Sequence, residues 1–219
     1  MAVSSGELSV DAHTCALLSD GTVKCWGGAG GWGYGNKDDQ RGPPSLLDTV
    51  SITTSPNVTV TQLVAGADHT CALLSDSTVK CWGGNEHGQL GLGNMNTIGD
   101  DELPSSVGPV SVTTTPGVTL VQLAAGSHVT CAVLSDGTAK CWGENFQGEL
   151  GYGILEHIGD DELPSSVGPI RISTTPGVTV KQIVTGFSHT CALLSDGSAK
   201  CWGRANHGEW QRHAPNHRG

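Results

Sequence analysis

Four near-copies of one 15-residue segment run through this chain. They read HTCALLSDGTVKCWG at 13–27, HTCALLSDSTVKCWG at 69–83, VTCAVLSDGTAKCWG at 129–143 and HTCALLSDGSAKCWG at 189–203. The first cysteines of successive copies are 56, 60 and 60 residues apart, a period close to that of propeller blades. A feature present four times favours architecture over an active site, because catalysis needs one constellation and a repeat array needs many equal units.

The composition favours short strands and disfavours binding to nucleic acid. The chain has 219 residues, a net charge of -10 and a pI near 5.2, so a general contact with phosphates is not expected. It contains 32 Gly and 10 Pro and no long segment with helical apolar spacing. No apolar run is long enough to insert into a membrane. The sequence therefore predicts an all-β fold with almost no helix.

Each repeat unit is predicted to contain four antiparallel strands. In the third unit we expect strands at Val110–Thr114, Thr119–Ala124, Val129–Leu134 and Thr138–Trp142, the first two separated by the turn at Pro116-Gly117. The last two strands form a hairpin. Its loop, Ser19-Asp20-Gly21 in the first unit, is typical of a type I turn followed by a left-handed Gly. The second unit has Ser77 in place of that Gly, so its turn is predicted to be strained.

The hairpin places the two cysteines of each copy opposite each other. We predict four cross-strand disulfides, with free buried thiols and zinc ligation as alternatives. Eight cysteines in equally spaced pairs suit an oxidising compartment, so an extracellular or cell-surface location is expected. Residues 1–10 do not resemble a signal peptide, and a cytoplasmic location is the alternative. The predicted pairs are Cys15 with Cys25, Cys71 with Cys81, Cys131 with Cys141 and Cys191 with Cys201.

Both faces of the hairpin are largely apolar, which indicates that each one packs between two neighbours. Stacked propeller blades provide such neighbours, whereas an open sheet with one wet face does not. The recurring tryptophans are predicted to be packing anchors between blades: Trp26, Trp82, Trp142 and Trp202. Three recurring histidines are predicted to be buried structural residues bonded to backbone carbonyls: His13, His69 and His189. In the third unit the histidine stands one position early, at His128.

The segments GADHTCAL at 66–73 and CWGGNEHGQLG at 81–91 resemble the repeat of the regulator of chromosome condensation family. The cysteine-bearing form is similar to repeats of bacterial secreted or surface proteins. The resemblance implies a seven-bladed β-propeller whose end loops bind partner proteins. Family members include exchange factors for small GTPases and propellers that inhibit β-lactamases.

A full ring of this kind needs about seven units, so the sequence predicts an incomplete ring of about 3.5 blades. We expect a partial propeller at 1–210, with units near 1–48, 49–108, 109–168 and 169–210, and a disordered tail at 211–219. The chain is expected to be a fragment of a larger surface or secreted protein. Uncovered blade faces are expected to drive self-association.

No catalytic residue, cofactor or metal site is predicted. GAGGWG at 28–33 spells a dinucleotide fingerprint but lacks the helix that must follow. Ser19, His13 and Asp20 are close in sequence, but Ser19 and Asp20 are turn formers and the whole set recurs in units two and four, so it is not read as a hydrolase triad. The copies differ most in their connecting loops, and loops on a rigid scaffold commonly carry binding. The candidate partner-binding residues are Glu86, His87, Phe146, Asp100, Asp101, Glu102, Asp160, Asp161 and Glu162.

The two acidic triplets in that set are interpreted mainly as solvated loops, with weak cation or partner contact as the alternative. The sequence thus favours a non-enzymatic module that binds a protein of unknown identity. The alternatives are an exchange factor for a small GTPase and a purely structural repeat.

Overall fold

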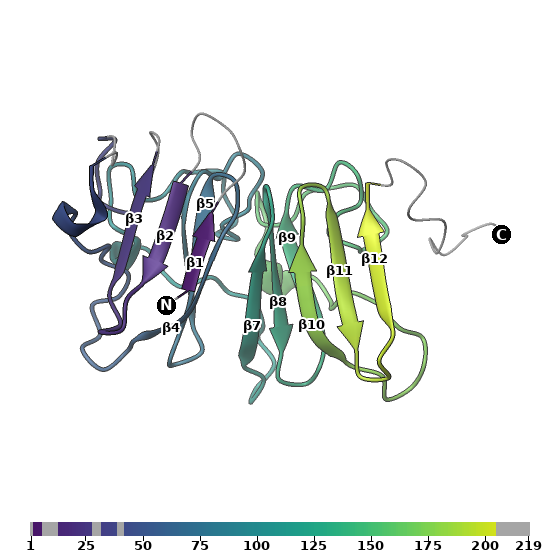
Figure 1. The fold of residues 1–219 in the computed structure, drawn as a ribbon. Helices are drawn as coiled ribbons and strands as arrows, with labels where there is room; N and C mark the ends of the chain where they lie inside the picture. The colour runs from purple at the N-terminus through teal and green to yellow at the C-terminus, as the bar shows by residue number, and fades with distance from the viewer. Residues whose placement is uncertain (1, 6–12, 28–31, 39–41, 205–219) are drawn as a thin grey trace.

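A computed structural model describes residues 2–5, 13–27, 32–38 and 42–204, which fold into four three-stranded antiparallel sheets (Figure 1). Each sheet is here called a blade. Blade 1 contains β1 (Ala2–Ser5), β2 (His13–Leu17) and β3 (Val23–Gly27), and blade 2 contains β4 (Val60–Ala65), β5 (His69–Leu74) and β6 (Val79–Gly83). Blade 3 contains β7 (Leu120–Ala125), β8 (Val129–Leu134) and β9 (Ala139–Gly143), and blade 4 contains β10 (Val180–Thr185), β11 (His189–Leu194) and β12 (Ala199–Gly203).

The blades follow one another in chain order, and the first strand of each blade contacts the first strand of the next. Blades 1 and 4 lie at opposite ends of the molecule in Figure 1. The predicted all-β fold of propeller blades is confirmed, with four sheets where about 3.5 blades were expected. Among the described residues the helical elements are three short 3-10 turns, η1 (Pro44–Leu46), η2 (Pro104–Ser106) and η3 (Pro164–Ser166). The predicted tail at 211–219 lies outside the described residues.

The prediction of four strands per blade is wrong, because the segment expected to form the extra strand makes a single ladder contact. In the third unit, the Val110 N–H donates to the Val79 carbonyl of β6, 2.9 Å away. The next carbonyl, that of Ser111, accepts from the Ser165 N–H of η3 instead of from a strand. The segment at 110–114 is therefore extended along the outer edge of blade 2, and the 3-10 turn interrupts its pairing.

The predicted hairpin register is confirmed in every blade. Cys15 lies opposite Cys25, and the corresponding cysteines of the other three blades are paired in the same way. All four pairs form disulfides, with Cα–Cα separations of 4.0–4.1 Å. The Leu18 N–H donates to the Thr22 carbonyl and the Gly21 N–H to the Leu18 carbonyl, as a three-residue hairpin loop requires.

Ser77 occupies the left-handed position of the hairpin loop in blade 2, with φ of 66°, where blade 4 has Gly197 with φ of 84°. A side chain in this conformation costs about 1 kcal/mol or more. We expect Ser77→Gly to raise the free energy of unfolding by about 1 kcal/mol in urea titrations. Gly197→Ser is the matched control and should lower the free energy of unfolding. A Cβ at this position meets no atom within 4 Å, so the loss would come from the backbone conformation alone. A Ser77→Gly variant that is no more stable would contradict the strain.

The inner hairpins are buried on both faces, as the sequence predicted. Every residue of β5 and β8 is buried, and the disulfides of blades 2 and 3 have almost no exposed surface. In blade 4, burial alternates along β11: Thr190, Ala192 and Leu194 are buried, whereas His189 and Leu193 are exposed. The face that carries the cysteines therefore points toward the next blade. In blade 4 no blade among the described residues covers this face, which we call the open face.

A lysine of the outer strand fixes the loops that leave each of the first three blades. Lys140 Nζ donates to the carbonyls of Pro164 and Val167, at 2.9 and 2.6 Å, at the two ends of η3. Lys24 and Lys80 make the same contacts with η1 and η2. Burial lowers the pKa of Lys80 and Lys140. These contacts hold the connecting loops against the blades that they follow.

Candidate functional site

The contacts between blades decide which loops come together, and a histidine–threonine pair crosses two of these seams. His13 Nε2 lies 2.8 Å from Thr70 Oγ1, and His69 Nε2 lies 2.8 Å from Thr130 Oγ1. The Thr130 hydroxyl donates its one proton to the Gln89 carbonyl. His69 Nε2 must therefore be the donor to Thr130.

One expectation for these histidines is corrected by this arrangement. His13 and His69 are buried, and each contacts a threonine hydroxyl of the next blade. His189 is exposed, because it stands on the open face of blade 4, where no described blade supplies the threonine. The repeated position is thus a contact to the next blade, and it is buried only where that blade is present.

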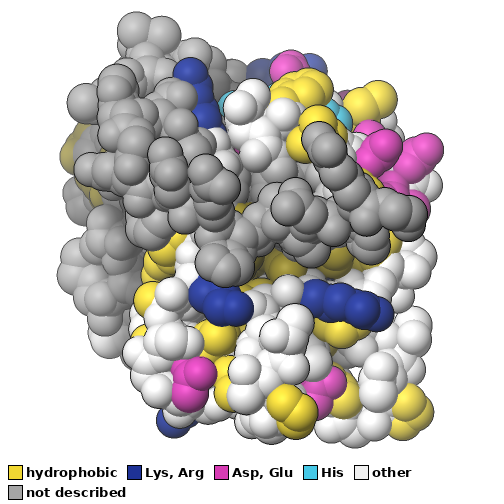
Figure 2. All heavy atoms as spheres, turned by 90° about the vertical axis from the view of Figure 1, so that its right-hand side faces the viewer, with side chains coloured by type: hydrophobic (Ala, Val, Ile, Leu, Met, Phe, Trp, Pro, Cys, Tyr) yellow, Lys and Arg dark blue, Asp and Glu magenta, His cyan; other side chains and the backbone are white. Residues whose placement is uncertain are grey.

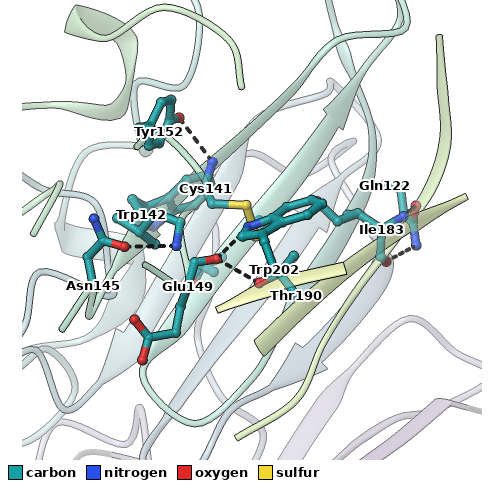
Figure 3. The surroundings of a disulfide bond; sticks show 12 residues. Gln122, Cys141, Trp142, Asn145, Glu149, Tyr152, Ile183, Thr190 and Trp202 are labelled. Atoms are coloured by element: carbon teal, nitrogen blue, oxygen red, sulfur yellow. Dashed lines mark hydrogen bonds between the residues drawn. A yellow bond between two sulfur atoms is a disulfide. The ribbon is translucent and has the colours of Figure 1, made fainter. Parts of the chain in front are cut away.

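Tryptophan, threonine and glutamine complete the seam between blades 3 and 4, as Figure 3 shows. The Glu149 carbonyl accepts from Trp202 Nε1 at 2.8 Å and from Thr190 Oγ1 at 2.9 Å. The Gln122 side chain donates to the Ile183 carbonyl at 3.0 Å and accepts from the Ile183 N–H at 3.1 Å. Trp82 and Trp142 are fully buried, whereas Trp26 and Trp202, in the end blades, are half-buried.

Burial lowers the pKa of His13 from 6.5 to about 4, and the nearby His69 adds to this effect. The unfolded chain therefore binds a proton between pH 6.5 and 4 that the folded chain does not. Stability from His13 is present above pH 6.5 and is lost as the pH falls toward 4, by about 3 kcal/mol. In urea titrations at pH 7.5 and 4.5, the stability difference between the protein and its His13→Gln variant should shrink at the lower pH. A difference that does not change with pH would contradict this assignment.

The loops that follow the outer strands are organised by one buried asparagine each. Asn85 donates to the carbonyls of Asn94 and Asn96 and accepts from the Leu90 N–H. Asn145 makes the same set of bonds to Ile154, Glu156 and Leu150. These internal bonds fix the shape of both loops, so the side chains that the loops carry are held in place.

Five side chains, from these loops and from the residue before β8, meet at one end of the seam between blades 2 and 3. His128 Nδ1 lies 2.9 Å from Glu144 Oε2. The His87 ring makes edge contacts with three rings, at centroid distances of 5.1 Å to His128, 5.3 Å to His157 and 5.8 Å to Phe146. The Phe146 and His157 rings are 4.5 Å apart. We call this set, His87, His128, Glu144, Phe146 and His157, the seam cluster.

The early position of the histidine in the third unit explains why His128 joins the seam cluster. Val129 occupies the buried slot that His69 fills in blade 2, and His128 occupies the slot of Asp68 at the end of the blade. Asp68 itself lies close by, with Oδ2 3.7 Å from His128 Nε2. Burial alone would raise the pKa of Asp68. The hydrogen bond from His69 and the charges of His69 and His128 outweigh the effect of burial, so the pKa is lowered.

Two of the candidate partner-binding residues, His87 and Phe146, lie in the seam cluster, and Glu86 is exposed on the neighbouring loop. Sequence reasoning placed Glu144 and His157 on the variable connecting loops but did not select them as candidate binding residues, and it treated His128 only as a departure from the repeat. Each of the three replaces a different residue at the matching position of blade 2, namely Gly84, Thr97 and Asp68. Differences between copies were the signal that could have identified them.

The acidic triplets are less solvated than expected. Asp100 pairs with Lys37 across the first seam at 3.2 Å, and Asp101 and Asp161 are exposed. Burial raises the pKa of Glu102, and so does the hydrogen bond that its protonated carboxyl donates to Asp101; Glu162 behaves in the same way with Asp161. The Gly93 N–H donates to the Gly159 carbonyl, so the loop at 159–162 packs against the loop of the preceding blade, next to the seam cluster.

The dinucleotide-like segment at 28–33 lies largely outside the described residues. Among the described residues, three groups of acidic or histidine side chains have ligand atoms within 4.8 Å of one another. Two are the acidic triplets, and the third is His87 with His128 and Glu144. Neither triplet contains a histidine, so the third group is the one with mixed nitrogen and oxygen donors.

Comparison with known proteins places this geometry in a family. The model of the regulator of chromosome condensation (RCC1) repeat matches residues 9–30, 60–89, 120–149 and 180–209, and a second model of the same repeat matches 77–133 and 136–193. The Ultraviolet-B receptor UVR8 of Arabidopsis thaliana is 32% identical over 90% of this chain and 40% of its own length. The probable E3 ubiquitin-protein ligase HERC6 of Homo sapiens is 31% identical over 90% of this chain and 18% of its own length.

Solved structures show the same fold. Human WBSCR16 superposes with a TM-score of 0.61 at 21% identity, covering 87% of this chain and 44% of that protein. Yeast RCC1 (Prp20), solved bound to Kap60, superposes with a TM-score of 0.59 at 24% identity, covering 87% and 41%. The chain thus spans less than half the length of these relatives. With four matched repeats and the same blade architecture, it belongs to the regulator of chromosome condensation (RCC1) repeat family.

Proposed function

We propose that this chain is a non-enzymatic module that binds a protein partner through the end loops of blades 2 and 3. The observation that carries the proposal is Phe146, whose side chain is 58% exposed on a loop that Asn145 holds in shape. Rigidly held aromatic residues contribute much of the affinity at protein interfaces, because they bury a large area and lose little conformational entropy.

The charges around Phe146 suggest the character of the partner. The acidic loops at 100–102 and 160–162, together with Glu86, give this end of the molecule acidic groups, and the whole chain carries a net charge of -10. Complementary charges speed association and fix its register more than they add affinity. The partner is therefore proposed to present an apolar pocket with a basic rim. Yeast Prp20, a protein of the same fold, was solved bound to Kap60 and was described by its binding properties to Gsp1p and histones, which supports protein binding as the general role.

The test uses a photo-crosslinking residue at position 146 to capture the partner and then measures the affinity of the purified pair. Phe146→Glu, which installs the Glu86 of the matching position in blade 2, should weaken binding at least about tenfold. Val121, which is 55% exposed on β7, provides the control as Val121→Glu and should change little. Equal crosslinking from positions 146 and 121, or equal affinity of the two variants, would overturn the proposal.

Self-association of two copies through the open face of blade 4 is a second candidate. Figure 2 views the molecule from this side and shows hydrophobic side chains interleaved with Lys or Arg side chains. Val184, Phe187 and Leu193 are 50%, 56% and 41% exposed. The neighbouring Gln182 and His189 are also exposed, and they are the counterparts of Gln122 and His69, which bind the next blade elsewhere.

A second copy that supplied a blade here would restore those contacts. Light scattering over a concentration series should then show dimers or larger species. Leu193→Lys should shift the series to monomer, whereas Val121→Lys should not. A monomer at all concentrations would contradict this candidate.

We further propose that the chain acts in an oxidising compartment, because four disulfides persist only where thiols are not kept reduced. Across the residues that the structure describes, no helix has the length and apolar character needed to cross a bilayer. Mass spectrometry of the protein isolated from its source under alkylating conditions should find all eight cysteines unmodified by the alkylating reagent. Extensive alkylation would place the chain in a reducing compartment instead.

A further inference from the structure

We propose that the seam cluster binds one divalent transition-metal ion through His87, His128 and Glu144. One imidazole nitrogen from each histidine and one carboxylate oxygen all lie within 4.8 Å of one another, and all three side chains are half-buried. This inference does not depend on the protein-binding proposal. It also departs from the sequence prediction of no metal site, because these residues come from two repeats and meet only through the seam.

The donor set suits zinc. Two imidazoles and one carboxylate form the His₂Glu set of open zinc sites, in which water or another ligand takes the fourth position. Tetrahedral zinc with bonds near 2.0–2.1 Å needs ligand atoms about 3.3 Å apart. His128 Nδ1 and Glu144 Oε2 are 2.9 Å apart, so this pair is already close enough. His87 completes the set with a shift of up to about 1.5 Å, within the range of a side-chain rotation.

The surroundings of His128 orient it for this role. A histidine that binds a metal through one nitrogen usually donates its other N–H to a carboxylate or carbonyl. In His128, Nδ1 faces Glu144, and Nε2 faces Asp68 Oδ2 at 3.7 Å. The ion would replace the proton between Nδ1 and Glu144, while the Nε2–H stays directed at Asp68. Gln89 Nε2 in turn holds both Asp68 oxygens at 3.2 Å.

His157 is excluded as a ligand by its tautomer. Its Nδ1 accepts the backbone N–H of Asn145 at 3.1 Å, so the ring proton is on Nε2, and neither nitrogen offers a free lone pair. His157 and Phe146 instead contact the edge of His87 and restrict its movement. The site therefore has three protein ligands and an open position toward solvent.

The ion would connect two blades. His87 comes from the loop after β6 of blade 2, whereas His128 and Glu144 flank the hairpin of blade 3. A ligand that binds only the folded state stabilises that state in proportion to the logarithm of its concentration. Zinc is therefore expected to raise the thermal midpoint in a concentration-dependent manner, by holding this seam closed.

The experiment titrates Zn²⁺ into the chelator-treated full chain by calorimetry, and Co²⁺ by visible absorption, in buffers without coordinating groups. We expect one strong site per chain and a cobalt spectrum of low-symmetry, four-coordinate type. His87→Gln and Glu144→Gly install the residues that blades 3 and 2 carry at the matching positions, Gln147 and Gly84, so the fold should tolerate them. Each should weaken the strong site at least tenfold and remove the zinc-dependent thermal shift.

His189→Val is the matched control, since it removes an exposed histidine of blade 4 and blade 3 has Val129 at this position. It should change zinc affinity less than threefold. Binding that is equally strong in the His87→Gln and Glu144→Gly proteins would overturn the proposal, as would the failure of the unaltered chain to bind zinc below millimolar concentration. Zinc binding is measured on the chain alone, without a partner protein, so the metal and partner proposals can fail separately.

Discussion

Trp142→Ala is expected to lower the free energy of unfolding by about 3–5 kcal/mol. Trp142 has no exposed surface and fills the seam between blades 2 and 3. Its Nε1 donates to the Gln89 carbonyl of blade 2 at 3.0 Å, so the variant loses a buried hydrogen bond in addition to leaving a cavity. Urea titration followed by far-UV circular dichroism measures the change.

Trp202→Ala is the control for this prediction. Trp202 makes the equivalent bond to the Glu149 carbonyl but is half-buried, whereas Trp142 is fully buried. Its replacement should cost about half as much or less, since the Trp202 side chain removes less apolar area from water. Equal losses in the two variants would show that the greater burial of Trp142 contributes nothing to stability.

Removal of the buried disulfide of blade 3, by the double replacement Cys131→Ala and Cys141→Ala, is expected to cost about 2–3 kcal/mol. The loop closed by the bond is short, and the loss of chain entropy that a cross-link of this length imposes on the unfolded state accounts for most of this value. Both cysteines are fully buried, and Ala fills less of the volume, so loss of packing adds to the effect.

The same replacement at Cys191 and Cys201 separates the two contributions. The loop length is identical, but these cysteines are half-buried on the open face of blade 4. The entropic part should be equal and the packing part smaller, so the terminal pair should cost less. If removal of the Cys191–Cys201 disulfide cost more stability than removal of the buried disulfide, packing between blades could not be part of how the disulfides stabilise the fold.

The hairpin was predictable from the sequence because its determinants are local. The loop residues Ser19-Asp20-Gly21 determine the turn, the turn determines the register, and the register places Cys15 opposite Cys25. The fourth strand was not predictable in the same way. Val110–Thr114 has strand-like residues, but its pairing ends where η3 takes the Ser111 carbonyl, a contact between residues 54 positions apart.

The candidate site was predictable only in part, for a related reason. Variation among copies identified the loops of His87 and Phe146, because local sequence shows where repeats differ. The convergence of His87 with His128 and Glu144 depends on how blade 2 stacks on blade 3. The exposure of His189 also depends on how the blades stack. The same repeat position is buried in His69, where the next blade covers it, and exposed in His189, where no described blade does.

Amide hydrogen exchange at Ile183 tests most directly whether the blades are joined by these repeated face contacts. The Ile183 N–H is bonded to the Gln122 side chain of the preceding blade, and the Leu123 N–H is bonded to Gln62 in the same way. In the Gln122→Ala variant, exchange at Ile183 should accelerate at least tenfold, while exchange at Leu123 stays unchanged. Unchanged exchange at Ile183 would contradict the stacking of blades through these seams.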